Sequence, residues 1–240
     1  MKYLAFDIEI AKAIPEDAAD WKQYRPLGIT CAATFTVGEH PHTWYSMRDG
    51  HYAPAMTQPD VRDLVGYLQY ITHKGYTILT WNGLAFDFDV LAEESGLHSV
   101  CAELAMHHVD MMYHIFCLRG HYLGLDKVAK GLKLSGKTEG MSGAKAPQMW
   151  AEGQQAKVLE YVAQDVRTTL EVARETMRLG MVQWTSASGR RNFIDIDRWL
   201  TVAEAQRLPL PDTSWMTNPV SRDKFTAWMM QYEALPQMGD

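Results

Sequence analysis

Apolar positions first mark a set of short β-strands. Residues 2–10 form an almost continuous apolar run, and residues 27–37 and 42–47 are rich in threonine and aromatic residues, as strands usually are. Residues 76–81 form another short apolar run. We therefore predict four strands, with a long polar loop over residues 14–26 after the first.

Helical periodicity marks the segments between and after these strands. Apolar residues recur three and four positions apart after Pro59, which suits a first helical turn, and Gly75 provides a stop. Further helices are predicted over about residues 88–96, 107–118, 124–134 and 154–179, with a loop over 135–148. The longest of these helices ends at Gly180.

The order of the predicted elements indicates an α/β fold. Strands that come first, followed by helices around a further strand, are typical of a mixed β-sheet flanked by helices. Beyond residue 180 the periodicity fades, and segments such as "LPLPDTSWMTNP" are rich in proline, serine and threonine. We therefore predict one domain over residues 1–180 and an irregular extension over residues 181–240 that packs on this core.

Composition narrows the possible classes of protein. The 240 residues carry a net charge of −6, which disfavours non-specific coating of nucleic acid or of an anionic membrane. The three cysteines form no CxxC pair, so neither a zinc ribbon nor a disulfide framework is expected. No apolar run approaches the roughly 20 residues of a membrane helix, and acids stand where a signal peptide would be apolar. We expect a cytoplasmic protein.

Two acids interrupt the first apolar run, in the sequence LAFDIEI. Asp7 and Glu9 are two positions apart, so a strand points both side chains to the same face. Adjacent anions repel each other and lose hydration when they are buried. The pair is either a solvated feature of a sheet edge or part of a site that supplies positive charge.

Two later segments also place acids beside predicted core elements. Asp87 lies between the strand at 76–81 and the helix that follows, although it could simply cap that helix, a role for which Asp89 competes. Tyr161 and Asp165 are four positions apart, so a helix places them on one face, together with nearby valines that point inward. Taken alone, Tyr161 could be an ordinary core residue.

A pocket of four carboxylates requires counter-charge. Hard divalent cations such as Mg²⁺ or Mn²⁺ prefer carboxylate oxygen and water as ligands. Two such ions about 3.5–4 Å apart can hold the attacking and leaving oxygens of a phosphoryl displacement. The sequence therefore predicts a two-metal site formed by four acids: Asp7, Glu9, Asp87 and Asp165.

Together, these segments resemble the DEDD superfamily of 3′–5′ exonucleases, which have a ribonuclease H-like fold. The matching motifs are Asp-x-Glu at residues 7–9, Asn-x-x-x-Phe-Asp at residues 82–87 and Tyr-x-x-x-Asp at residues 161–165. Tyr161 is similar to the tyrosine of the DEDDy branch, whereas a DEDDh enzyme would have histidine in place of Glu160. The resemblance covers about residues 1–180.

The resemblance implies a role for each motif residue. Asp7 would bridge both ions, Glu9 and Asp165 would hold the ion nearer the attacking water, and Asp87 would hold the other. Tyr161 would orient the water. Asn82 and Phe86 would bind the terminal nucleotide.

The activity implied by the resemblance is hydrolysis of phosphodiester bonds from the 3′ end of single-stranded or frayed DNA or RNA. The implied cofactors are two Mg²⁺ or Mn²⁺ ions, the implied partner is a nucleic-acid 3′ end rather than a membrane, and a separate polymerase or repair protein is compatible with this role. Two alternatives remain open: a ribonuclease H-like endonuclease, and a non-catalytic nucleic-acid-binding or assembly module of the same fold. The sequence does not specify the sugar or the oligomeric state.

Other features outside these motifs have two interpretations. In "HHVDMMYH", His107, Asp110 and His114 lie near one helical face and could bind a transition metal, or Asp110 could cap or support the site from outside it. Residues 119–157 contain seven basic residues and three acidic ones, which could guide phosphates or form a solvated face: Arg119, Lys127, Lys130, Lys133, Lys137, Lys145, Lys157, Asp126, Glu139 and Glu152. Arg190 and Arg191 could extend this flank, and Trp44, Trp81 and Trp150 are either stacking surfaces for bases or core residues.

Overall fold

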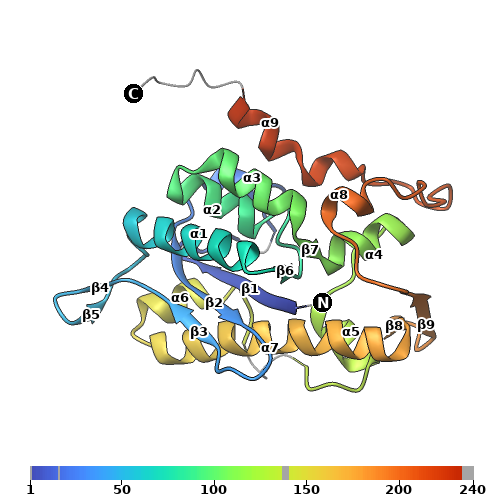
Figure 1. Ribbon diagram of the computed structural model, residues 1–240, viewed down its shortest axis with the longest axis horizontal. Coiled ribbons are helices and arrows are strands. Elements are labelled where there is room, and N and C mark those ends of the chain that lie inside the picture. Colours follow the sequence, from blue (N-terminus) through green and yellow to red (C-terminus); the bar gives the residue numbers. More distant parts are fainter. Residues whose placement is uncertain (1, 16, 137–140, 234–240) are drawn as a thin grey trace.

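A five-stranded mixed sheet forms the centre of the protein (Figure 1). The computed structural model describes residues 2–15, 17–136 and 141–233. Strand β1 (Lys2–Ile10) lies in the middle of the sheet, antiparallel to β2 (Ile29–Phe35) and parallel to β6 (Tyr76–Thr80). Strands β3 (His42–Trp44) and β7 (Val109–Asp110) form the two edges.

Helices cover both faces of the sheet, as Figure 1 shows. One face packs against α1 (Gln58–His73), α2 (Asp87–Ser95) and α3 (His98–His107). The other packs against α5 (Leu125–Gly131), α6 (Ala146–Ala151) and the long α7 (Gln155–Leu179), while α4 (Met111–Arg119) directly follows the edge strand β7. The α/β class with a mixed sheet flanked by helices is thus confirmed. No helix in the described ranges is long and apolar enough to cross a membrane.

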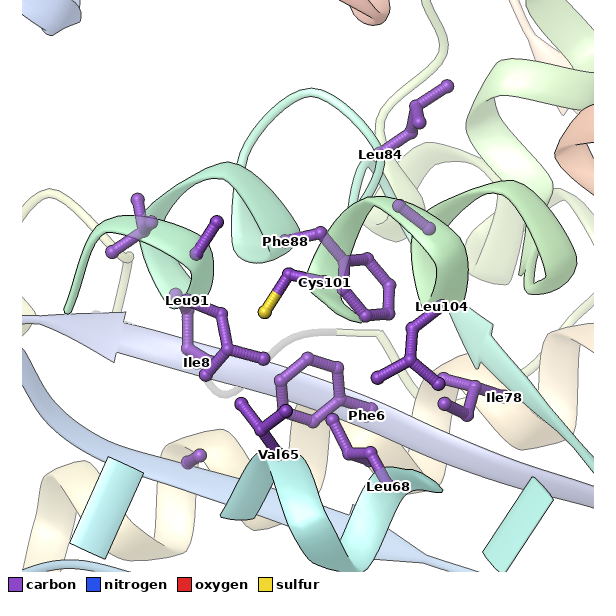
Figure 2. Close-up of a cluster of buried hydrophobic side chains, with 14 of the residues drawn as sticks. Phe6, Ile8, Val65, Leu68, Ile78, Leu84, Phe88, Leu91, Cys101 and Leu104 are labelled. Carbon is purple, nitrogen blue, oxygen red and sulfur yellow. The ribbon is translucent and has the colours of Figure 1, made fainter. Parts of the chain in front are cut away.

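The alternation of side chains along β1 separates an apolar face from an acidic one. Phe6 and Ile8 point toward the helices α1 to α3 and join a continuous apolar core (Figure 2). The other labelled members of this core are Val65, Leu68, Ile78, Leu84, Phe88, Leu91, Cys101 and Leu104. Because neighbouring side chains of a strand alternate, Asp7 and Glu9 lie on the opposite face, which α7 covers.

Small residues on this second face allow α7 to approach the sheet closely. Ala33 of β2 pairs with Asp7 and Cys31 of β2 pairs with Glu9, and both small side chains are completely buried. Val162 and Val166 of α7 fill the space above them within the same core cluster. The packing therefore brings the inward side of α7 next to the two acids of β1.

Several elements differ from the sequence prediction. The helix predicted over 107–118 was wrong in its start: α3 ends at His107, residues 109–110 pair with β6 as β7, and α4 begins at Met111. The loop predicted over 135–148 ends earlier, since α6 begins at Ala146, and residues 137–140 lie outside the described residues. The strand predicted over 42–47 ends at Trp44 in β3, and a short hairpin of β4 (Met47–Arg48) and β5 (His51–Tyr52) follows it. The 3₁₀ helix η1 (Trp21–Tyr24) lies within the loop predicted over 14–26.

The segment after residue 180 is more regular than the sequence suggested. It begins with a hairpin of β8 (Met181–Thr185) and β9 (Arg191–Asp195) and continues with α8 (Val202–Ala205), η2 (Arg222–Phe225) and α9 (Ala227–Glu233). Strand β8 contacts α5, and α8 and α9 contact α3. The Arg222 guanidinium donates hydrogen bonds to four backbone carbonyls, those of Cys117, Gln206, Leu208 and Pro209. These contacts fasten the segment to the core, while its separation from residues 1–180 as a unit of its own stays a prediction.

Candidate active site

Three of the predicted metal ligands converge between β1 and α7. One carboxylate oxygen from each of Asp7, Glu9 and Asp165 lies within 4.8 Å of the others. Glu9 and Asp165 are each only 5% exposed, and Asp7 is half-buried. In the described part of the chain, no other group of three or more histidine, cysteine, aspartate or glutamate residues lies close enough to share an ion.

The fourth acid, Asp87, joins the cluster through β1. Pairing between β1 and β6 extends only as far as Ala5, so the backbone beyond it needs another partner. The Ile8 N–H donates to Asp87 Oδ1 at 3.2 Å, and the Asp87 carboxyl shares a hydrogen bond with that of Asp7. Asp87 thus lies beside Asp7, at the start of α2.

Asp87 does not occupy the N-cap position of α2, so the alternative that it only caps this helix is wrong. The residue at the N-cap of α2 is Phe86, which makes no side-chain capping hydrogen bond. Asp89 does not cap the helix either, because its fully buried carboxylate forms ion pairs with Lys22 at 3.0 Å and Arg25 at 2.6 Å. The two neighbouring acids therefore have separate tasks, and Asp87 is the one that faces β1.

Burial controls protonation in the acid cluster. It raises the pKa of Asp87 to about 7, because the ionised carboxylate loses hydration there. It also raises the pKa of the Tyr161 hydroxyl, and the nearby carboxylates of Asp165, Glu9 and Asp7 raise that pKa further. Tyr161 donates a hydrogen bond to Asp165. The phenol therefore stays protonated at neutral pH and acts as a hydrogen-bond donor, not as a base.

A tight turn after β6 carries Asn82, and Asp110 holds this turn in place. The backbone of Asn82 is left-handed, with φ of 73°. Asp110 accepts hydrogen bonds from the N–H groups of Asn82 and Leu84, both at 3.0 Å, and from Tyr113 N–H at 3.0 Å. Burial raises the pKa of Asp110. One carboxylate thus fixes the turn and caps α4.

Thr80 and His108 support the same turn from the core. A Cβ at Gly83 would meet Thr80 Oγ1 at 2.5 Å, so only glycine fits. The Gly83 N–H donates to Thr80 Oγ1 at 3.2 Å, and this hydroxyl lies 3.0 Å from His108 Nε2. Burial lowers the pKa of His108 to about 3, so the imidazole is neutral. Thr80 and the neutral His108 thus add uncharged support to the turn that Asp110 also holds.

The transition-metal alternative finds no support in the structure. His107 is exposed at the end of α3, where its Nδ1 lies 2.9 Å from the carbonyl of Glu103. His114 is buried in α4, and its Nδ1 accepts a hydrogen bond from Leu200 N–H at 3.4 Å. Asp110 directs its carboxylate at backbone N–H groups, which matches the supporting role that the sequence left open.

Two hollows meet at the acids. The first has a volume of about 450 Å³, and Ile14 and Pro147 form part of its wall. It is also lined by all seven predicted site residues, which are Asp7, Glu9, Asn82, Phe86, Asp87, Tyr161 and Asp165. The second, of about 430 Å³, shares Asp7, Trp81, Asn82 and Asp165 with the first and continues along residues 122–126. A third hollow of about 460 Å³ between α1 and α3 contains only one carboxylate, that of Glu103, and lies outside this site.

The predicted aromatic and basic surfaces are only partly realised. Trp81 lines both hollows, whereas Trp44 packs on Tyr67 and Trp150 is buried, so the last two are core residues. In the basic flank, Lys130 pairs with Asp126 at 2.7 Å, and Lys137 and Glu139 lie outside the described residues. Sequence reasoning missed Trp215, which is 67% exposed, because no local pattern distinguishes an exposed tryptophan from a buried one.

Comparison with known proteins supports the fold. Residues 50–177 match the model of a family described as the RNase_H superfamily, a range that contains Asp87 and Asp165 but begins after Asp7 and Glu9. The structure of the family B DNA polymerase from the hyperthermophilic archaeon Pyrobaculum calidifontis is similar, with a TM-score of 0.51 and 17% sequence identity. The similarity covers 73% of this chain and 24% of the polymerase chain, so this chain corresponds to about a quarter of that protein. At this identity the similarity shows the fold alone. No curated protein sequence matches the chain.

Proposed function

Since the chain belongs to the RNase_H superfamily, we propose that it is a metal-dependent 3′–5′ exonuclease of the DEDDy type. The observation that carries this proposal is the convergence of four acids from three distant segments. Asp7, Glu9 and Asp165 lie within reach of one ion, and Asp87 contacts Asp7. Tyr161 stands one helical turn before Asp165, which is the spacing of the DEDDy motif, and it donates a hydrogen bond to Asp165.

The donor set fits Mg²⁺ or Mn²⁺. The cluster offers only carboxylate oxygens, which are the ligands that these hard cations prefer, and it contains no histidine or cysteine among its members. Asp7 belongs to the group with Glu9 and Asp165 and also contacts Asp87, which supports its assignment as the ligand that two ions would share. When bound, the two ions would offset the carboxylate charge, activate a water molecule and stabilise the leaving oxygen.

The remaining residues would position the substrate. Asn82 and Phe86 line the first hollow, whose volume of about 450 Å³ lies in the range of small-ligand sites. That size suits one unpaired terminal nucleotide better than a base pair, which favours a single-stranded or frayed 3′ end. The protonated Tyr161 hydroxyl would orient the attacking water without removing its proton.

One observation favours a second candidate function. The second hollow continues past the acids, so a strand could pass through the site without ending there. An endonuclease of the same fold would use such a passage. The presence of all four acids argues against the other alternative, a non-catalytic nucleic-acid-binding or assembly module.

A cleavage assay separates these functions. We expect 5′-labelled DNA or RNA oligonucleotides to give a ladder of single-nucleotide steps with Mg²⁺ or Mn²⁺ and no products with EDTA. Both sugars are tested because the similar structure is that of a DNA polymerase, while the acids themselves do not distinguish DNA from RNA. Cutting of a circular substrate would identify the endonuclease. If neither ion supports cleavage, the result favours the non-catalytic binding module.

Proton release should accompany ion binding. In the metal-free protein, burial raises the pKa of Asp87 from 3.8 to about 7, so this carboxyl holds a proton at pH 6 that an ion must displace. We therefore expect the affinity for Mg²⁺ or Mn²⁺ to fall as the pH is lowered from about 8 to about 6. Isothermal titration in two buffers of different ionisation enthalpy measures the protons released. The Asp87→Asn variant is the control, since it has no proton to release at this position.

The same shift gives the metal-free protein a characteristic dependence of stability on pH. Because the folded-state pKa of Asp87 lies above its ordinary value, the folded chain binds more protons than the unfolded chain between about pH 4 and pH 7. This contribution to stability is present at low pH and is lost as the pH rises through about 7. An increase in stability with pH across this window, after correction with the Asp87→Asn variant, would contradict the assigned protonation state.

A further inference from the structure

Trp215 is a largely exposed tryptophan that a tight turn holds in one position. Its side chain is 67% exposed, which is unusual for so large an apolar group. Trp215 Nε1–H donates to the carbonyl of Asp212 at 3.1 Å, and Ser214 N–H donates to Asp212 Oδ1 at 3.0 Å. The Met216 N–H closes the turn on the carbonyl of Thr213 at 2.9 Å. The ring is therefore exposed and also oriented.

The turn packs closely on the end of α4. Gly120 ends this helix with a left-handed backbone, and a Cβ there would collide with Thr213 Cγ2 and lie 3.4 Å from Pro211 Cγ. No larger residue fits between the helix and the turn. The turn that carries Trp215 is therefore packed against the end of α4 through the side chains of Thr213 and Pro211.

Aromatic residues connect Trp215 with the acids. The ring of His121 lies 6.3 Å from that of Trp215, and its chain neighbour Tyr122 is 48% exposed. Tyr122 lines the second hollow, which also contains Asp7 and Asp165. We call Tyr122, His121 and Trp215 the aromatic path. It leads from the acid cluster to the surface of the C-terminal segment.

The charge beside the aromatic path suits a phosphate backbone. Exposed Arg119 and Lys127 come from α4 and α5, the two helices on either side of His121 and Tyr122 in the chain. The acid at the mouth of the second hollow, Asp126, is paired with Lys130 at 2.7 Å, which reduces its repulsion of an anion. Open aromatic faces beside basic side chains are the features with which proteins bind single-stranded nucleic acid.

We propose that the single strand upstream of the bond to be cut leaves the acids through the second hollow and stacks its bases on Tyr122 and Trp215. This inference rests on the proposed function: if the terminal nucleotide occupies the first hollow and its phosphate lies at the acids, the strand must continue on the other side. The second hollow is the described cavity that shares Asp7 and Asp165 with the first. Trp215 lies in the C-terminal segment, outside the residues that match the superfamily.

Substrate length provides the test. The KM and kcat of the wild type and the Trp215→Ala and Trp215→Phe variants are measured on a dinucleotide and on a single strand of about 12 nucleotides. Stacking of one base on an aromatic ring corresponds to roughly 5- to 140-fold in affinity. We expect Trp215→Ala to raise the KM for the longer strand by a factor in this range, with kcat unchanged and the dinucleotide unaffected. Trp215→Phe should restore most of the loss, because it keeps an aromatic face.

Tyr70→Ala is the matched control, since Tyr70 is an exposed aromatic residue on α1, outside both hollows. If the wild type cleaves and Trp215→Ala behaves like Tyr70→Ala on the longer strand, the aromatic path is overturned while the proposed function stands. An equal loss on the dinucleotide and on the longer strand would also overturn it, because the dinucleotide does not reach Trp215. If the wild type neither cleaves nor binds either substrate, the proposed function is overturned, and the aromatic path that rests on it is overturned with it.

Discussion

The Asp7→Asn variant should lose cleavage by roughly a thousandfold or more, since charge stabilisation of the reacting oxygens is the main contribution of such a site. Asparagine keeps the shape of the side chain and removes the negative charge that Asp7 places beside Asp87 and in the group with Glu9 and Asp165. The folded metal-free protein should be as stable as the wild type or slightly more stable, because one source of repulsion is gone. Gel assays of cleavage and thermal melting in EDTA measure the two effects.

Asp63→Asn is the matched control for this variant, because Asp63 is an exposed acid on α1. It should leave both cleavage and the melting temperature unchanged. Wild-type activity in Asp7→Asn would remove Asp7 from the mechanism. A large fall in the melting temperature of the metal-free variant would mean that Asp7 stabilises the fold and would weaken its assignment as a ligand.

A second large effect is expected at Asp110, which touches neither hollow. Asp110→Ala leaves three backbone N–H groups, those of Asn82, Leu84 and Tyr113, without their acceptor. Each buried donor that loses its partner costs roughly 1–3 kcal/mol, so the free energy of unfolding should fall by about 3 kcal/mol or more. Cleavage should fall as well, because Asn82 is displaced from the first hollow. Chemical denaturation and the KM for a single strand provide the measurements.

A capping residue elsewhere separates the two roles of Asp110. Thr57 caps α1 by accepting a hydrogen bond from Asp60 N–H at 3.4 Å, away from the acids. Thr57→Ala should cost about 1 kcal/mol and leave the KM unchanged. If Asp110→Ala lowers stability without raising the KM at temperatures where it is folded, Asp110 supports only α4, and the turn that carries Asn82 keeps its position by other means.

The strongest local patterns in the sequence predicted both sides of the site. The apolar run of β1 is interrupted only by Asp7 and Glu9, and the alternation of strand side chains places those acids on one face. The helix that carries Tyr161 and Asp165 has a long periodic stripe and ends at Gly180, whose φ of 71° closes it. Neither prediction required knowledge of distant contacts.

The missed elements depend on contacts that local patterns do not encode. Strand β7 has only two residues, so pairing with β6 alone defines it. The β8–β9 hairpin turns through "SASGR" in a stretch rich in small and polar residues, which resembles an irregular segment. The role of Asp110 as acceptor for three N–H groups becomes visible only once α4 and the turn after β6 lie side by side. The exposure of Trp215 is likewise a property of the folded chain that no local sequence pattern indicates.

The origin of the acids has a consequence for folding. They come from residues 7, 9, 87 and 165, and contacts between β1 and α7 span most of this length. Such distant contacts form late, after the entropy of closing the long intervening loop has been lost. Consider a chain that has formed its sheet and the helices α1 to α3 but has not yet docked α7. It would show much of the final circular dichroism signal but would lack the assembled ion-binding site. Recovery of ion binding during refolding would therefore report completion of the fold, which spectroscopy of secondary structure alone would miss.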